Sequence, residues 1–294
     1  MKTIALITFI IGIALFSTRA QEKPSAIPSE TRISGAIITT IDDGDFVHPT
    51  FSPDGKVLAY SSVLVNGDLE NTEVLLHNLG TNRRSLLLSS KKAATYATYK
   101  AFVTEMKWTS AKRLAVKISD GDVDSTQLIF DPQRRRLLKE RFEGGDEPET
   151  RPLSPVEQKV YQQARSLFPH DSVNAFNGGV SFKSATVLAL SRGTKTYLFL
   201  YRDEKISRLG EFDSIGYSWI EVKHVSSSKV IFLLRTHETF DRGDNPLFIF
   251  DGTKLLRIKE YSELHDAAVD PAGRRIAYCY WAGDKRHIAV KELR

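Results

Sequence analysis

Two stretches of the chain follow the same pattern: FVHPTFSPDGKVLAYSS at residues 46–62 and LHDAAVDPAGRRIAYCY at residues 264–280. In each, a short apolar run leads to a Pro-x-Gly turn, a basic residue and a second apolar run containing Ala-Tyr. Proline suits the second position of a type I turn and glycine the fourth. The pattern predicts two similar β-hairpins about 220 residues apart, which indicates an internal repeat.

The repeat recurs along the whole chain. Taking Ala59 as a marker, the equivalent positions are Ala115, Ala189, Phe232 and Ala277, at spacings of 56, 74, 43 and 45 residues. After each marker, a glycine at residue 67, 121, 193, 243 or 283 separates two apolar runs of strand-forming side chains. Because glycine accepts the positive φ of a tight hairpin turn, each repeat contains antiparallel strands.

Four antiparallel strands repeated at about 45 residues are typical of a β-propeller blade. We therefore predict an all-β propeller of four-stranded antiparallel blades in one domain, residues 33–294, with five blades favoured and six possible. The last repeat stops after its third strand, at residues 287–293, and a spare strand, GAIITTI at residues 35–41, precedes the first. We expect these two strands to pair, because pairing removes an open sheet edge.

The 74-residue interval contains an insertion at residues 142–172. Its first half is acidic and rich in Pro and Gly, and SPVE at residues 154–157 then supplies an N-cap, a proline at the first helical position and the glutamate of a capping box. We predict a short helix near residues 154–168 that crosses one mouth of the ring. A degenerate sixth blade within the insertion is the alternative.

The first twenty residues have the pattern of a secretory signal peptide: a positive Met1-Lys2, an apolar run at residues 4–16, and small residues at Thr18 and Ala20. We predict cleavage after Ala20, export to the periplasm or the extracellular space and no membrane span thereafter; an uncleaved anchor is the alternative. Residues 21–32 are interpreted as a flexible lead-in. Without residues 1–20, 39 scattered basic residues face 36 acidic ones, which does not favour nucleic acid.

The stretch FSPDGKVLAY at residues 51–60 resembles the repeat of TolB-type propellers. The second stretch keeps Pro271, Gly273 and Ala277-Tyr278, and Trp108 keeps the aromatic start of its repeat. TolB-like propellers more often have six blades than five. The resemblance implies a non-catalytic, exported propeller that acts as a protein- or peptide-binding scaffold in the cell envelope, with no cofactor.

Propellers place ligands near the central channel or on the face whose loops enter the innermost strands. The candidate binding residues near those strand starts are Asp45, His48, Glu105, Asn174, Tyr217 and His265. Histidines and carboxylates that converge on one channel could bind a metal or transfer protons, although such residues also occur wherever strands end in solvent. A glycan-acting enzyme or lectin that uses the channel is the alternative function. Three channel carboxylates within about 10 Å would favour it, and a channel lined by apolar or unpaired neutral residues would exclude it.

Other catalytic patterns are missing or incomplete in the sequence. No Gly-x-Ser-x-Gly elbow of an α/β-hydrolase occurs, and Cys279 lies within an apolar strand, where a buried inert thiol is expected. Aspartates alternate at residues 42–45 and 120–124, but neither segment has the glycine and distal glutamate of an EF-hand loop, so both are interpreted as turns. We therefore predict no catalytic residues and no metal site.

Overall fold

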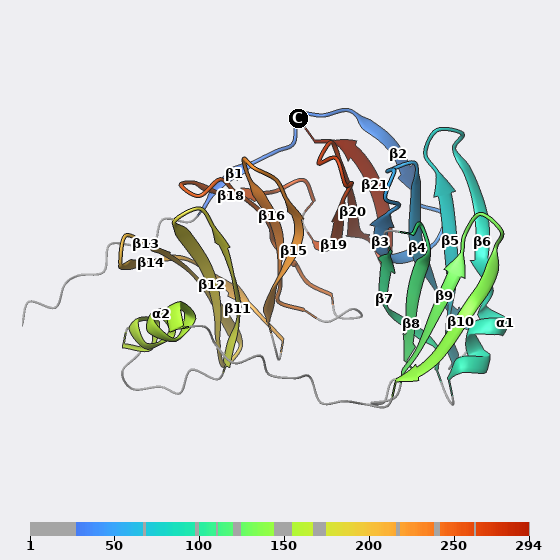
Figure 1. Cartoon of the computed structure of the whole chain (residues 1–294), viewed down its shortest axis with the longest axis horizontal. Helices are drawn as coiled ribbons and strands as arrows, with labels where there is room; N and C mark the ends of the chain where they lie inside the picture. Colours follow the sequence, from blue (N-terminus) through green and yellow to red (C-terminus); the bar gives the residue numbers. More distant parts are fainter. Residues whose placement is uncertain are drawn as a thin grey trace, which may run out of the picture.

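Within the described residues, five β-sheets form the fold (Figure 1). The structure is a computed structural model that describes residues 28–66, 69–97, 100–109, 111–119, 125–143, 155–166, 175–215, 218–237, 242–261 and 263–293. Each sheet is a blade of four antiparallel strands, with one further strand added to blade 4. The chain is a β-propeller, as the repeat predicted.

Four strands follow one another along the chain in most blades. Blade 1 contains β3 (Asp45–Phe51), β4 (Val57–Asn66), β5 (Leu69–Asn78) and β6 (Arg83–Leu88), followed by the short helices α1 (Ser90–Ala93) and η1 (Ala94–Tyr96). Blade 2 contains β7 (Phe102–Trp108), β8 (Leu114–Ser119), β9 (Ser125–Asp131) and β10 (Arg136–Glu143). Blade 3 contains β11 (Ala175–Phe182), β12 (Ala185–Arg192), β13 (Lys195–Arg202) and β14 (Lys205–Asp213). Blade 4 contains β15 (Trp219–Val225), β16 (Val230–Arg235), β17 (Leu247–Phe250) and β18 (Leu255–Ile258).

Blade 5 is built from both ends of the described chain. It contains β19 (Leu264–Val269), β20 (Arg275–Ala282), β21 (Lys285–Glu292) and the N-terminal strand β2 (Ile37–Ile41). Strand β2 pairs antiparallel with β21, with Thr40 opposite Ala289 and Ile41 opposite Ile288. The predicted closure by residues 35–41 and 287–293 is therefore confirmed, and the last blade acquires its outer strand from the start of the chain.

The blades follow one another in an arc (Figure 1). The innermost strands β7, β3, β19, β15 and β11 contact one another in that order, so blades 1 and 5 are neighbours in space. This arrangement explains the two repeated stretches of sequence, which form the inner hairpins of these adjacent blades.

The N-terminal lead-in is shorter than expected. Strand β1 (Ser29–Thr31) pairs in parallel with β18 of blade 4, with Glu30 opposite Arg257. Residues 29–31 therefore form a strand rather than part of a flexible segment. Residues 1–27, which include the predicted signal peptide, lie outside the described residues.

The described part of the insertion is the helix α2 (Pro155–Ser166), which confirms the predicted helix. It does not cross a mouth of the ring but packs on blade 3, beside β13 and β14 in Figure 1. Val160 is fully buried, and Tyr161 packs on a cluster formed by Leu190, Tyr197 and Phe199. No strand occurs at residues 155–166, so this part of the insertion is not a sixth blade.

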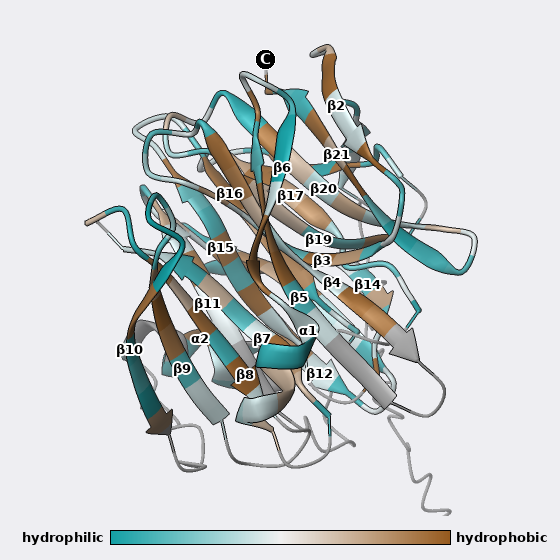
Figure 2. Cartoon of the chain, turned by 90° about the vertical axis from the view of Figure 1, so that its right-hand side faces the viewer, coloured by the Kyte–Doolittle hydropathy of each residue, from teal (hydrophilic) through white to brown (hydrophobic). Residues whose placement is uncertain are grey.

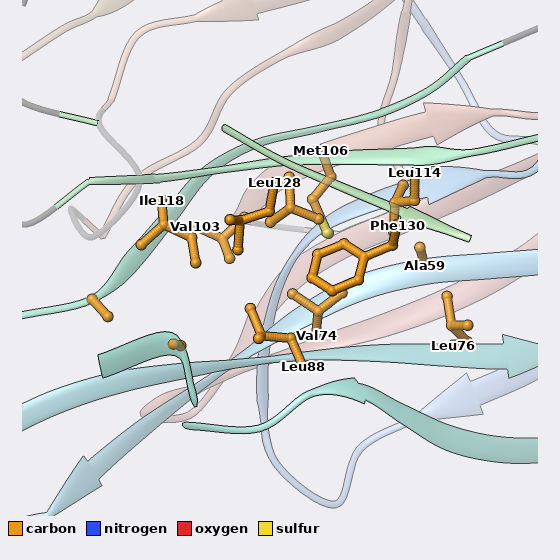
Figure 3. Close-up of a cluster of buried hydrophobic side chains, with 13 residues drawn as sticks. Ala59, Val74, Leu76, Leu88, Val103, Met106, Leu114, Ile118, Leu128 and Phe130 are labelled. Carbon is orange, nitrogen blue, oxygen red and sulfur yellow. The ribbon is translucent and has the colours of Figure 1, made fainter. Parts of the chain in front are cut away.

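Apolar clusters between neighbouring blades form the core. Between blades 1 and 2, Ala59 lies with Leu114 and Phe130 in a buried cluster that joins β4 and β5 to β8 and β9 (Figure 3). The small side chain of Ala59 is fully buried, as expected for close packing between blades. Hydrophobic residues follow the strands, while many connecting loops are hydrophilic (Figure 2).

The repeated turns have the predicted geometry. The amide of Gly55 donates to the carbonyl of Ser52 at 2.7 Å, and that of Gly273 donates to Asp270 at 2.8 Å. Their φ values are +67° and +66°, a conformation that favours glycine. The sequences SPDG and DPAG therefore form equivalent turns in blades 1 and 5.

Candidate functional site in the central cavity

The innermost strands of four blades line a central cavity of about 940 Å³, a size typical of small-ligand sites. Its polar lining comes from β3, β7, β15 and β19, with Arg235 at the end of β16. Within blade 4, Trp219, Glu221 and Lys223 occupy alternate positions of β15, so the strand presents them to the same cavity.

A network of charged side chains occupies one side of this cavity. Oδ1 of Asp266 accepts from Nζ of Lys223 at 2.9 Å and lies 2.8 Å from Nη2 of Arg235. Glu221 bridges the same two cations, accepting from Lys223 at 2.6 Å and from Nε of Arg235 at 2.8 Å. Two carboxylates and two cations from blades 4 and 5 are thus held in one array.

Burial affects the groups of this array unequally. The side chain of Asp266 is 4% exposed, whereas that of Glu221 is 37% exposed. Burial alone would raise the pKa of Asp266, but Arg235 and Lys223 outweigh it and hold that pKa well below its usual range. Burial would likewise lower the pKa of Arg235, but Asp266 and Glu221 raise it instead. Asp266 and Arg235 are therefore a permanently charged pair at neutral pH.

His48 joins the array through a strained backbone. Its φ is +54°, which is uncommon for a residue with a side chain, and it lies where the register between β3 and β4 shifts. Its Nδ1 is 3.7 Å from Oδ2 of Asp266. Its Nε2 is buried without a hydrogen-bond partner among the described residues. The strain thus places an imidazole beside a buried carboxylate, with its second nitrogen unused.

The sequence candidates divide into three groups. His48 and Glu105 line the cavity. Asp45 does not, because its carboxylate is paired with Arg286, accepting from Nε and Nη2 at 2.7 Å each. His265 is fully buried beside the ring of Trp281 rather than in the cavity lining. Asn174 and Tyr217 lie outside the described residues.

The fully buried His265 is electrostatically constrained. Both of its ring nitrogens lack hydrogen-bond partners among the described residues. Burial, with Arg235 and Arg286 nearby, holds its pKa well below the usual value, so the ring is neutral. Asp45 therefore links blade 1 to blade 5 through Arg286, and His265 is buried within blade 5; neither side chain lines the cavity.

Sequence reasoning missed most of the charged array, namely Glu221, Lys223, Arg235 and Asp266. Two signals were present: Asp266 directly follows the candidate His265, and Glu221 and Lys223 alternate along one strand. Nothing in the sequence indicated that Arg235 lines the cavity. It lies on the second strand of its blade and reaches the cavity only through the register of β15 and β16.

The described residues contain no group of three His, Cys, Asp or Glu side chains arranged to hold a metal ion. No helix among them is long and apolar enough to cross a membrane. Of the aspartates at residues 42–45 that alternate like a calcium loop, Asp43 accepts from Arg84 at 2.7 Å and Asp45 from Arg286 at 2.7 Å. Cys279, fully buried, donates from Sγ to the carbonyl of Phe46, and burial raises its thiol pKa.

A scan against protein-family models and a search of curated proteins each found no match. Solved structures that are similar include the propeller domain of the trilobed protease from Pyrococcus furiosus, with 14% identity, a TM-score of 0.27 and coverage of 84% of this chain and 66% of that one. A gluconolactonase from Xanthomonas campestris has 11% identity, a TM-score of 0.39 and coverage of 92% and 98%. An α-L-arabinofuranosidase from Podospora anserina has 9% identity, a TM-score of 0.40 and coverage of 91% and 98%.

The similar structures include peptidases, a gluconolactonase and α-L-arabinofuranosidases, so the prediction of a non-catalytic protein is contradicted: the comparison points to enzyme-related propellers. At these identities and TM-scores the similarity assigns no activity to this chain. The chain also spans only 66% of the trilobed protease propeller and 39% of the acylaminoacyl peptidase of Pyrococcus horikoshii.

Proposed function

We propose that the chain acts on a glycan in its central cavity. The observation that carries this proposal is the convergence of three carboxylates, Glu105, Glu221 and Asp266, from three blades on one cavity. Glu221 and Asp266 bind the same Nζ of Lys223, at 2.6 and 2.9 Å. Their oxygens therefore lie closer together than the upper limit of about 9.5 Å for paired glycosidase acids.

The charges of the lining favour a neutral ligand. Among the described lining residues, the three carboxylates are matched by three cations, Lys107, Lys223 and Arg235. A ligand with many hydroxyls suits such a lining, because each hydroxyl donates to a carboxylate and accepts from a cation. Trp219 is 44% exposed in the same lining and offers a flat apolar surface for a sugar ring.

The acidic side chains differ in what they can do. Asp266 is buried and neutralised by Arg235 and Lys223, so it positions these cations and remains ionised. Glu105 and Glu221 are the more accessible carboxylates: the exposed Glu105 is suited to donate a proton, and Glu221, held by Lys223 and Arg235, is suited to accept one. The unused Nε2 of His48 offers a third position for proton transfer.

The proposal is tested with the variants E105Q and E221Q, which keep side-chain size but cannot accept protons. A panel of neutral oligosaccharides should raise the melting temperature of the wild-type protein, and 4-nitrophenyl glycosides report hydrolysis. We expect both variants to lose hydrolysis, by about 100-fold or more. The matched control is E140Q, since Glu140 is exposed on the outer strand β10. Unchanged turnover in E105Q and E221Q, or no melting shift with any glycan, would contradict the proposal.

We further propose that the protein is an exported, TolB-type propeller. The FSPDGKVLAY repeat and the pattern of residues 1–20 support this. Cell fractionation and N-terminal sequencing test it: a mature chain that begins at Gln21 is expected.

A protein or peptide partner also stays a prediction. A pull-down from envelope extract, comparing the wild-type protein with a variant that lacks residues 144–168, tests whether the insertion binds that partner.

A further inference from the structure

A second groove, of about 400 Å³, lies between blades 1 and 2, at the end where their hairpins turn. The turns β3–β4, β5–β6, β7–β8 and β9–β10 all contribute to its lining. It shares no lining residue with the central cavity. It is therefore a separate site, and a ligand bound there is independent of the glycan proposed for the cavity.

The groove is strongly basic. Among the described residues of its lining, the four cations Arg83, Arg84, Lys112 and Arg135 outnumber one carboxylate, that of Asp54. Asp54 is already engaged, accepting from the hydroxyl of Ser52 at 2.7 Å and lying 3.9 Å from Nζ of Lys112.

The cations of the groove differ in whether they have a partner. Arg84 is paired with Asp43 outside the groove, at 2.7 Å. Arg83 and Arg135 have no carboxylate partner among the described residues, although both line the groove. The positive charge of the groove is thus only partly neutralised by the chain itself.

Two of these cations stand on strained turn positions. The φ of Lys112 is +57° and that of Arg135 is +51°, whereas the repeated turns place Gly55 and Gly273 in this conformation. Blade 3 also has side chains at such positions, but there Lys183 is accompanied by the acidic Asp203 and Glu204. What distinguishes blade 2 is that its two strained turn positions bring charges of one sign to one groove.

The groove also has an apolar floor. Val57, Leu76 and Trp108 line it, and Leu76 and Trp108 are continuous with the buried cluster between blades 1 and 2. Nε1 of Trp108 donates to the carbonyl of Thr50 at 3.3 Å, which fixes the indole. A basic rim above a fixed aromatic ring suits a ligand with an apolar body and an anionic group.

We propose that this groove binds a small organic anion, whose apolar ring packs on Trp108 and Leu76 and whose phosphate or carboxylate is held by Arg83, Lys112 and Arg135. The volume of about 400 Å³ and the four turns that line the groove favour a small molecule. Charge complementarity supplies the affinity, so binding weakens with added salt.

Isothermal titration of the full chain with phenyl phosphate tests this, with inorganic phosphate and phenol as the two halves of the probe. We expect a Kd for phenyl phosphate below about 1 mM and weaker binding of each half. The variant R83A/R135A should lose at least about tenfold in affinity, and R83K/R135K, which retains both charges, should recover part of it. Circular dichroism confirms that each variant is folded.

The matched control is K91A/K205A, which removes two exposed cations outside the groove and should leave the affinity unchanged. E105Q distinguishes the two sites, because it changes the central cavity and not the groove. It should bind phenyl phosphate as tightly as the wild-type protein, whether or not the glycan proposal holds. The proposal is overturned if phenyl phosphate does not bind, or if it binds R83A/R135A as tightly as the wild-type protein.

Discussion

Arg275 of blade 5 reaches over Gly55 of blade 1, so that a Cβ at Gly55 would clash with Nη2 of the arginine. The guanidinium is anchored by Asp270, which accepts from Nε at 3.1 Å, and lies over the ring of Phe51. Arg275 of the second repeated sequence thus contacts the turn glycine, Gly55, of the first, and joins the two turns.

The variant G55A separates two effects of this glycine. At φ +67° an alanine is strained by about 1 kcal/mol or more, and its methyl group must also displace Arg275. Gly193 is the matched control, because its φ is +56° but nothing lies within 4 Å of an added Cβ. In urea unfolding, we expect G55A to lower the free energy of unfolding more than G193A does. Equal losses would show that the contact with Arg275 contributes nothing.

Closure of the ring by the N-terminal strand is tested on two isoleucines of β2. Ile41 is 1% exposed and packs between blades 5 and 1, whereas Ile37 is 59% exposed. I41A should therefore cost about 2–5 kcal/mol of unfolding free energy, because it leaves a cavity in the core. I37A on the same strand should change it by less than about 0.5 kcal/mol. If both variants melt like the wild-type protein, β2 does not stabilise blade 5 in solution.

The sequence was sufficient for the architecture because turns and strand periodicity are local signals. SPDG specifies its own turn, and the missing outer strand of the last repeat could be matched to residues 35–41 by counting strands. The site was harder, because Arg235 and Asp266 meet only after two blades pack together. Asp45 and His48, three residues apart, appeared equivalent in the sequence. The structure separates them: Asp45 pairs with Arg286, and the positive φ of His48 places its ring beside Asp266.

The buried array should be essential for stability. D266N removes the charge that Arg235 and Lys223 share in an environment where these cations are 9% and 11% exposed. Because D266N leaves these buried cations uncompensated, we expect it to lower the free energy of unfolding by about 3–5 kcal/mol, as measured by chemical unfolding. E221Q removes a carboxylate that is 37% exposed, so solvent screening should limit its effect to about 1 kcal/mol. A larger loss from E221Q than from D266N would contradict the assignment of Asp266 as the anchor.

Stability should fall as the pH drops below about 6.5, the ordinary pKa of an unfolded histidine. Burial lowers the pKa of His265, His77 and His224 in the folded protein, so the unfolded chain binds more protons in this range. By linkage, the free energy of unfolding then decreases with decreasing pH. In H265L the decrease should be shallower, because His77 and His224 remain. An H265L profile that parallels the wild-type profile from pH 7 to 5 would show that His265 does not contribute.

Replacing His48 should separate stability from function. Its φ of +54° suits glycine, so H48G removes backbone strain and should raise the free energy of unfolding by up to about 1 kcal/mol. Asp266 keeps Arg235 and Lys223 as partners in this variant, so the array stays neutralised. H48N is the second variant, since asparagine tolerates this conformation but cannot titrate. Both should lose glycan turnover while melting at or above the wild-type temperature, the trade-off expected where a strained residue serves a site. Lower melting temperatures with undiminished turnover would instead assign His48 to the fold alone.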